Sequence, residues 1–465
     1  MKTRRHFIGT AAGAAAIWSI HPTLAAFAPQ ASRPVPTRAQ LEWQKDEIAL
    51  FLHFGVNTFT DREWGDGKED PAIFNPTKLD TRQWARAAKA AGAKAMILTA
   101  KHHDGFCLWP TKTTTHSVAS SPFRGGKGDV VREFVDACRE FNLKAGLYLS
   151  PWDRNAAVYG DSPKYNEFYR TQLTELLTQY GRIDEVWFDG ANGEGPNGKK
   201  QEYDWPATWS LVRKLQPEAV MFSDAGPDVR WIGNENGVAG TTNWSTVDPD
   251  VVKVPGVSGP AVTKMLREGD PNGSAWRPGE TDVSIRPGWF YHPADDAKVR
   301  SVDNLVNLYF TSVGRNSKLL LNVPPTRDGL LHDIDVERLA GMRKKLNELF
   351  TIAAPAREAG ERAKMTIVTR GDDARAGSLM EIAEDFGRER RITISELRED
   401  IAGGQSVAGY RIEGSIDKMT WQALATGTTI GYCKLDRFPP ATVRYIRTII
   451  TSAVGPVRPL TTRFF

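Results

Sequence analysis

A helix-then-strand unit recurs along this chain, and it constrains the fold more than any other feature of the sequence. Between residues 80 and 224, a segment with one apolar helical face is followed four times by a short, almost continuous apolar run. In the first unit, Asp80 is placed to cap the helix 81–92, and the run 94–100 follows. Apolar strands that alternate with amphipathic helices are typical of a parallel sheet covered by helices on its faces.

The number of apolar runs predicts an α/β fold built as a (β/α)8-like barrel. The irregular stretch 226–293, rich in Gly and Pro, could hold two further strands, which would complete the eight that such a barrel needs. An open doubly wound sheet is the alternative, although no G-x-G-x-x-G follows any run, which disfavours its dinucleotide-binding version. The six runs are 48–57, 94–100, 144–150, 183–190, 218–224 and 318–325.

The sequence changes character near residue 355. After the helical segment 333–350, Val, Ile, Thr and Tyr recur at every second position between turn residues, which is typical of an antiparallel sandwich. The 465 residues also exceed the roughly 250 to 300 that one core accommodates. We therefore predict a catalytic barrel over residues 29–352 and a C-terminal β-sandwich over residues 355–465.

The first 28 residues are predicted to be an export signal. Arg4 and Arg5 precede a weakly apolar stretch, 8–20, and small residues follow at 26–28, which is the order of a twin-arginine-type signal peptide. The apolar stretch is shorter than the roughly 20 residues that cross a bilayer, so we predict no membrane span. The mature protein is expected to be periplasmic or secreted.

Charge and cysteine content argue against several classes of partner and site. The formal net charge is +4, and Lys2, Arg4 and Arg5 lie in the predicted signal, so the mature chain is close to neutral. Nothing in this balance predicts binding to nucleic acid or to an anionic membrane surface. The three cysteines are widely spaced and form no C-x-x-C pattern, which predicts no disulfide framework.

Polar and aromatic residues stand where successive strands are predicted to end, and the active site of a barrel lies at this carboxyl edge. The polar residues include His53, His102, His103, Tyr148, Asp189 and Asp224. Several tryptophans also fall in or beside these loops: Trp64, Trp152, Trp187, Trp231 and Trp289. Because an indole face packs well on the apolar face of a pyranose ring, the pattern favours a saccharide site.

The adjacent His102 and His103 suggest a metal site at first sight. Neighbouring side chains on a strand point to opposite faces, however, and the first strand offers one histidine, His53. This ligand set is too small for a metal-dependent barrel hydrolase. We predict no metal and no cofactor.

A barrel hydrolase without a metal, rich in tryptophan and carboxylates, favours glycoside hydrolysis, which needs two carboxyl groups. Asp189 is the best nucleophile, because it ends an apolar run and Gly190 behind it leaves room for substrate. Spacing leaves the choice of acid open. The candidates are Glu63, Glu194, Glu235 and Glu280.

Five motifs, in order along the chain, resemble the alpha-L-fucosidases of glycoside hydrolase family 29. They are HFG at 53–55, EW at 63–64, KHHDGF at 101–106, GLYLSPWD at 146–153 and VWFDG at 186–190. The segments 223–237 and 280–292 are similar to the branch that acts on alpha-1,3/1,4-linked fucose in Lewis-type glycans. The C-terminal region resembles the discoidin-like sandwich that follows the barrel in this family.

The resemblance implies an exo-glycosidase that removes terminal alpha-L-fucose from fucosylated oligosaccharides with retention, through a fucosyl-enzyme. It implies that Asp189 is the nucleophile and Glu235 the acid/base, with Glu280 as the second choice for the latter. Retention predicts carboxyl groups about 5 to 5.5 Å apart. The residues that would line the fucose pocket are His53, Glu63, Trp64, His102, His103, Tyr148, Trp187 and Trp289.

Two other functions stay open at this point. The first is a carbohydrate-binding protein with an inactive barrel, and the second is a glycosidase for another 6-deoxy or galacto-configured sugar. The carboxylates at Asp189 and Glu235 disfavour the first. The sequence predicts no oligomeric state.

Overall fold

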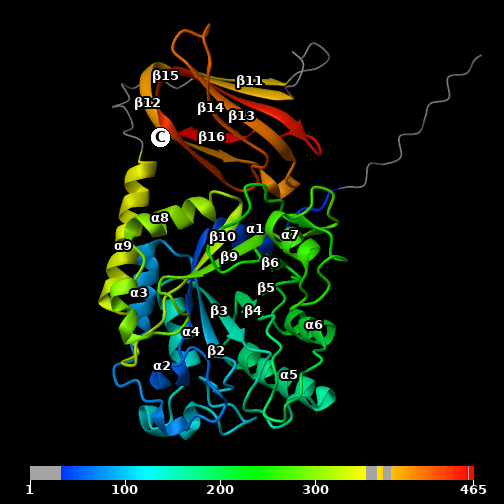
Figure 1. Cartoon of the computed structure of the whole chain (residues 1–465), viewed down its shortest axis with the longest axis vertical. Helices are drawn as coiled ribbons and strands as arrows, with labels where there is room; N and C mark the ends of the chain where they lie inside the picture. The colour runs from blue at the N-terminus through cyan, green and yellow to red at the C-terminus, as the bar shows by residue number, and fades with distance from the viewer. Residues whose placement is uncertain (1–32, 352–363, 370–378, 459) are drawn as a thin grey trace, which may run out of the picture. The chain divides into compact units, whose positions relative to one another are not determined.

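Eight parallel strands close into a barrel in the order β1-β10-β9-β6-β5-β4-β3-β2 (Figure 1). The structure is a computed structural model that describes residues 33–351, 364–369, 379–458 and 460–465. The predicted barrel is confirmed and the open-sheet alternative is wrong, because β1 pairs with both β2 and β10. The strands are β1 Ile48–Leu52, β2 Ala95–Lys101, β3 Lys144–Leu149, β4 Glu185–Trp187, β5 Val220–Ser223, β6 Val229–Trp231, β9 Gly279–Ser284 and β10 Ser317–Asn322.

Burial on both faces explains why the barrel strands are almost continuously apolar. Every residue of β1, β2 and β10 is buried. Alternate side chains, such as Phe51 and Ile97, belong to a core cluster inside the barrel, whereas Leu50 and Met96 belong to the cluster under the helices. Each such side chain contributes about 1.5 to 3 kcal/mol by leaving water.

Helix ends follow the capping residues of the sequence. The Asp80 carboxylate accepts the Arg82 N–H at 2.9 Å, and Gly92 ends the helix in the left-handed region, at φ 81°. Asp129 accepts from Arg132 at 2.8 Å in the same way. The helices are α1 Arg38–Lys45, α2 Val56–Thr60, α3 Thr81–Ala91, α4 Val130–Glu140, α5 Ser162–Gln179, α6 Trp205–Leu215, α7 Pro260–Glu268, α8 Val302–Thr311 and α9 Asp333–Phe350.

The irregular stretch 226–293 supplies the two missing barrel strands, β6 and β9, as predicted. Between them lie α7 and a short antiparallel pair, β7 Thr246–Val247 with β8 Ala275–Trp276. This long connection also carries Glu235, directly after β6. It therefore brings a loop from an irregular region to the carboxyl end of the barrel.

The C-terminal region forms an antiparallel sheet in the order β11-β12-β15-β13-β14, with β16 paired to β12. The predicted antiparallel arrangement is confirmed. The long strands β12 and β15 pair with shifts of register, between Asp385 and Arg390 and again between Ile392 and Ile394. The strands are β11 Lys364–Thr369, β12 Met380–Arg398, β13 Val407–Ser415, β14 Gln422–Gly427, β15 Lys434–Ala453 and β16 Thr461–Phe464.

Hydrogen bonds join this sheet to the amino side of the barrel. The Arg398 guanidinium donates to Glu47 at 2.7 Å, and the Tyr432 N–H donates to the Asn316 side chain at 2.8 Å. Glu47 and Asn316 directly precede β1 and β10, so these contacts lie opposite to the carboxyl ends of the strands.

Two sequence predictions concern other parts of the chain. The predicted signal peptide, residues 1–28, lies outside the described residues. Within the described ranges, no helix combines the length and the apolar character needed to cross a bilayer.

Candidate active site

The residues predicted at the ends of β1 to β3 lie together. The ring centroids of His53 and His102 are 5.6 Å apart, and those of His102 and His103 are 4.1 Å apart. The Tyr148 ring lies 6.0 Å from His102. The closed barrel brings these side chains together because the carboxyl ends of its parallel strands share one rim.

The three histidines are buried and neutral near pH 7. Burial lowers the pKa of His53 to about 3, lowers that of His102 well below its usual 6.5, and lowers that of His103 against the opposing charge of Asp189. Nδ1 of His53 lies 2.9 Å from the Asn322 side-chain oxygen. A neutral imidazole has one donor and one acceptor nitrogen, which suits recognition of sugar hydroxyls.

Asp189 lies just past β4 and is held by neighbouring groups. Its Oδ2 accepts from the Tyr148 hydroxyl at 3.2 Å and lies 3.9 Å from Nε2 of His103, while Oδ1 accepts the Ala191 N–H at 2.7 Å. The side chain is 27% exposed. The carboxylate is thus fixed in direction yet reachable, as a nucleophile must be.

Glu235 lies in the loop after β6, within electrostatic range of Asp189. Burial raises the pKa of Glu235, and the charges of Asp189 and Glu63 raise it further, while a hydrogen bond with Trp289 opposes the shift. A carboxyl group in this environment keeps its proton to a higher pH than a free glutamate does. That property suits a general acid.

Two further carboxyl groups lie near these residues: Asp224, which the sequence placed at a strand end without assigning it a role, and Asp282, which the sequence did not single out. Burial and the charge of Asp189 raise the pKa of Asp224 to about 6. Burial and the charge of Glu235 raise the pKa of Asp282, which accepts from the Trp231 indole at 2.8 Å. Asp224 follows β5, so its strand-end position is a usable signal, whereas Asp282 lies in the irregular stretch and carries none.

Glu63 connects two loops at the rim of the pocket. Its carboxylate accepts the backbone N–H groups of Trp289 and of Phe290, the latter at 3.2 Å. The neighbouring Trp64 is 58% exposed, and its ring lies 6.2 Å from that of His103. Glu63 therefore supports the loop of Trp289 as well as the one that carries Trp64.

Trp187 and Glu280 meet inside the barrel. The Trp187 indole N–H donates to Glu280 at 3.0 Å, and its ring stacks on Phe222 at 4.2 Å between centroids. Glu280 is fully buried and lies 3.8 Å from the Lys318 ammonium. The Glu280 carboxylate is thus engaged with Trp187 and Lys318 inside the barrel.

Lys101 and Asp104 of the KHHDGF motif face the protein interior. The Lys101 ammonium donates to Asp153 and to Gln172, both at 2.9 Å. Asp104 accepts the Phe106 N–H at 2.7 Å. These residues brace the loop that presents the two histidines.

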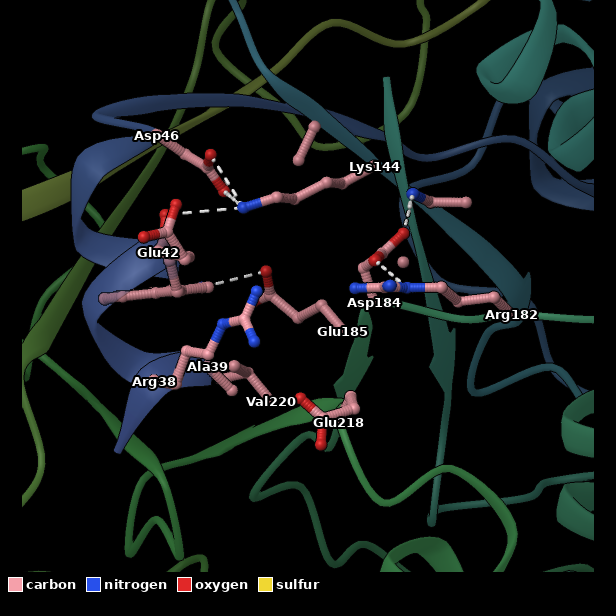
Figure 2. Close-up of a pocket in the computed structure, with 14 residues that line it drawn as sticks. Arg38, Ala39, Glu42, Asp46, Lys144, Arg182, Asp184, Glu185, Glu218 and Val220 are labelled. Carbon is pink, nitrogen blue, oxygen red and sulfur yellow. Dashed lines mark hydrogen bonds and ion pairs between the residues drawn. The ribbon is translucent and has the colours of Figure 1, made fainter. Parts of the chain in front are cut away.

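A different cavity, of about 380 Å³, opens at the amino ends of β3, β4 and β5. Figure 2 shows its charged side chains turned toward one another, with Lys144 paired to Asp46 at 2.7 Å and Arg182 to Asp184 at 2.7 Å. Glu185, on the same wall, accepts from the Trp43 indole at 2.9 Å.

Among the described residues, no group of three or more His, Cys, Asp and Glu is arranged to hold a metal ion, at either end of the barrel.

Comparison with known proteins gives a consistent result. Residues 35–348 match the family model described as alpha-L-fucosidase. Alpha-L-fucosidase 1 of Arabidopsis thaliana is 44% identical over 426 residues, which cover 87% of this chain and 82% of the plant protein.

Solved structures agree with this match. A glycoside hydrolase 29 family member from an unknown rumen bacterium superposes with a TM-score of 0.83 at 42% identity, covering 93% of this chain and 77% of that one. A GH29 fucosidase from Ruminococcus gnavus, solved in complex with fucose, gives a TM-score of 0.80 at 32% identity, covering 90% of this chain and 92% of that one.

Proposed function

Because this chain belongs to the alpha-L-fucosidase family and is an alpha-L-fucosidase, we propose that it is an exo-acting enzyme that works with retention of configuration. In this proposal Asp189 is the nucleophile and Glu235 the acid/base. The observation that carries it is the geometry of Asp189, whose carboxylate accepts from the Tyr148 hydroxyl and the Ala191 N–H and is 27% exposed; the raised pKa of Glu235 agrees with it. Two interacting carboxyl groups with different environments are what a double displacement requires.

The reaction follows in two steps. Asp189 attacks the anomeric carbon while protonated Glu235 donates its proton to the departing oxygen, which yields a fucosyl-enzyme. Glu235, now a carboxylate, takes a proton from water, and that water displaces Asp189 from the sugar. The Tyr148 hydroxyl, which donates to Oδ2 of Asp189, orients this carboxylate for the reaction.

The remaining predicted residues bind the sugar in this proposal. The neutral His53, His102 and His103 hydrogen-bond with ring hydroxyls, and Trp64 and Trp289 cover apolar faces of the substrate. Trp187 contributes its ring to the pocket floor, because its N–H already bonds with Glu280.

The proposed substrates are alpha-1,3/1,4-fucosylated oligosaccharides of the Lewis type. The support is the resemblance of segments 223–237 and 280–292 to that branch of the family. We further propose export to the periplasm or the medium, supported by the twin-arginine pattern of residues 1–28.

The stereochemical proposal is tested by following the first minutes of hydrolysis by NMR. Retention releases alpha-fucose first, and the beta anomer appears later by mutarotation. Early release of beta-fucose would contradict the double displacement and the role given to Asp189.

The linkage proposal is tested by incubating the protein with a Lewis-type trisaccharide, with an alpha-1,2-fucosylated trisaccharide and with an aryl fucoside. The proposal expects the Lewis-type substrate to have the highest kcat/KM. Preference for the alpha-1,2 linkage would refute the branch assignment while leaving the fucosidase activity intact.

The acid/base assignment is tested with Glu235→Gln. The variant should lose roughly 10²- to 10⁴-fold in kcat/KM on the trisaccharide, and much less in kcat/KM on an aryl fucoside, because kcat/KM reports formation of the fucosyl-enzyme and an aryl leaving group needs little protonation. Glu194→Gln, in an exposed loop, is the matched control and should keep activity. Equal losses on both substrates would contradict a role in proton donation.

A further inference from the structure

The imidazole of His292 lies between two carboxylates. Its Nδ1 is 2.9 Å from Oδ1 of Asp61, and its Nε2 is 3.0 Å from Oε2 of Glu63. An ionised carboxylate can only accept hydrogen bonds, so both contacts require an N–H on both ring nitrogens. This geometry is satisfied by the imidazolium and cannot be satisfied by either neutral tautomer.

The contact joins two loops that are far apart in the sequence. Asp61 and Glu63 follow α2 and lead to Trp64, whereas His292 belongs to the loop after β9 that carries Trp289. Glu63 also accepts the backbone N–H groups of Trp289 and Phe290. The two rim tryptophans are therefore carried by loops that share one ion-paired junction.

The junction continues into the pocket. The Trp289 carbonyl accepts from the Asn322 side-chain amide at 2.8 Å, and the oxygen of the same amide lies 2.9 Å from Nδ1 of His53. A hydrogen-bonded path thus runs from His292 through Glu63 and the Trp289 backbone to a buried pocket histidine. This path links His292 to a group of the proposed fucose site.

We propose that His292, as an imidazolium bonded to Asp61 and Glu63, is a positioning residue that holds the loops of Trp64 and Trp289 together over the fucose pocket. This inference rests on the proposed function of that pocket. It adds a residue that the sequence did not single out. It also assigns Glu63 a second role, to accept the hydrogen bond from His292 that joins the two loops. We call the three side chains the His292 bridge.

The charges around the bridge favour its protonated form. Asp61 and Glu63 raise the pKa of His292, against an opposing effect of burial. The acidic residues that follow on the 3-10 helix η4 (Pro293–Lys298) pair elsewhere, Asp295 with Lys298 and Asp296 with Arg286. His332 pairs with Asp296 at 3.5 Å, so it does not compete with His292 for the carboxylates of Asp61 and Glu63.

Deprotonation should loosen the rim. Below the raised pKa, His292 donates to both carboxylates. Above it, one ring nitrogen becomes an acceptor that faces a carboxylate, and one of the two bonds is lost. The expected consequence is a KM that increases as pH rises through the pKa of His292, with a smaller change in kcat from this group.

The test compares kcat and KM of the full-length enzyme on a fucosylated trisaccharide from about pH 5 to about pH 9, the range in which histidines titrate. His292→Ala should raise KM by about tenfold at pH 6, since it removes charge-assisted bonds. It should also abolish the rise of KM between neutral and alkaline pH. His332→Ala, a partly exposed histidine paired with Asp296, is the control and should keep the wild-type profile.

A second variant protects the test against a folding defect. In Asp61→Asn the side-chain oxygen can still accept the hydrogen bond, but its charge is gone, so the midpoint of the KM profile should move to lower pH. An unmoved midpoint in Asp61→Asn, or a wild-type profile in His292→Ala, would overturn the proposal. Failure of the proposed function would look different, because the wild-type enzyme would then release no fucose from the trisaccharide or the aryl fucoside.

Discussion

At the amino end of the barrel, Lys144 lies 2.7 Å from Asp46 and Lys318 lies 3.0 Å from Glu185. At the carboxyl end, Asp282 is buried and Asp224 is partly buried, yet no lysine or arginine of the described residues lies within ion-pairing distance of either. Their pKa values are raised instead, by burial and by neighbouring carboxylates. The barrel therefore pairs these buried charges at its amino end, whereas at its carboxyl end it pairs Lys101 with Asp153 but leaves Asp224 and Asp282 without a cation.

The two ends of the barrel therefore suit different roles, stability at the amino end and proton transfer at the carboxyl end. Paired charges satisfy each other and stabilise the protein, so few of their polar atoms remain free to bind a ligand. Carboxyl groups without a cation shift their pKa toward neutrality, and such groups are candidates for proton transfer. Four substitutions test this difference between the two ends of the barrel.

Asp189→Ala should abolish the catalytic activity of the carboxyl end. Removal of a nucleophile costs roughly 10⁴-fold or more in kcat, and the fold should persist because the side chain is partly exposed. The measurement is kcat on an aryl fucoside, together with the melting temperature. Asp250→Asn, at an exposed position, is the control. Retained activity in Asp189→Ala would remove the basis for treating this end as catalytic.

Lys318→Met should instead cause a large loss of stability of the folded protein. The change leaves the buried Glu185 and Glu280 without their cation, which costs about 3 to 5 kcal/mol in the free energy of unfolding. Chemical denaturation measures this loss. Lys45→Met breaks an exposed pair with Glu42 and should cost less than about 1 kcal/mol. Similar losses in the two variants would contradict the structural role assigned to the amino end.

Asp224→Asn should reduce the loss of stability that accompanies a rise of pH through about 6. The pKa of Asp224 is raised to about 6 from 3.8, so the folded state binds this proton more tightly than the unfolded state does. The resulting stability is present at pH values below 3.8 and is lost as pH rises through about 6. The loss is at most about 3 kcal/mol.

Denaturation of wild type and Asp224→Asn at pH 5 and at about pH 7.5 measures this effect. The wild type should lose more stability between the two values than the variant, whose amide oxygen can still accept the Gly256 N–H. Parallel changes in the two proteins would show that Asp224 ionises without cost.

Glu280→Gln should have the smallest effect on catalysis. An amide oxygen can still accept the Trp187 indole N–H, so kcat/KM should fall by less than about tenfold. A loss as large as that of Glu235→Gln would reverse the assignment of the acid/base and would place the interior of the barrel among the catalytic regions. The measurement is kcat/KM on the trisaccharide for both variants.

The sequence predicted those features that depend on local pattern. The run 94–100 became β2, the caps at Asp80 and Asp129 begin their helices, and the irregular stretch 226–293 contains β6 and β9. Strand ends were sufficient to find Asp189, since a barrel gathers them at one rim. Glu235 could be chosen over Glu280 from the family resemblance alone, because both lie in the irregular stretch.

The features that the sequence did not predict depend on contacts between distant segments. The sequence around Glu280 does not predict that Lys318 lies beside it inside the barrel. The sequence around His292 likewise does not predict its contacts with Asp61 and Glu63, more than two hundred residues earlier. The apolar run 183–190 was also longer than the strand, since β4 ends at Trp187. Beyond it, Phe188 still donates its N–H to the Phe222 carbonyl of β5 at 3.0 Å, whereas the Asp189 carboxylate accepts the N–H of Ala191.

The bond between Trp187 and Glu280 also bears on how inhibitors of this enzyme should be designed. Because the indole N–H is used inside the barrel, Trp187 would offer only its ring to a sugar in the proposed pocket. A polar substituent aimed at that wall would lose its hydration without gaining a partner, whereas a methyl group or a flat ring would bury apolar area there. Compounds that differ at this single position should therefore rank in affinity by their lipophilicity.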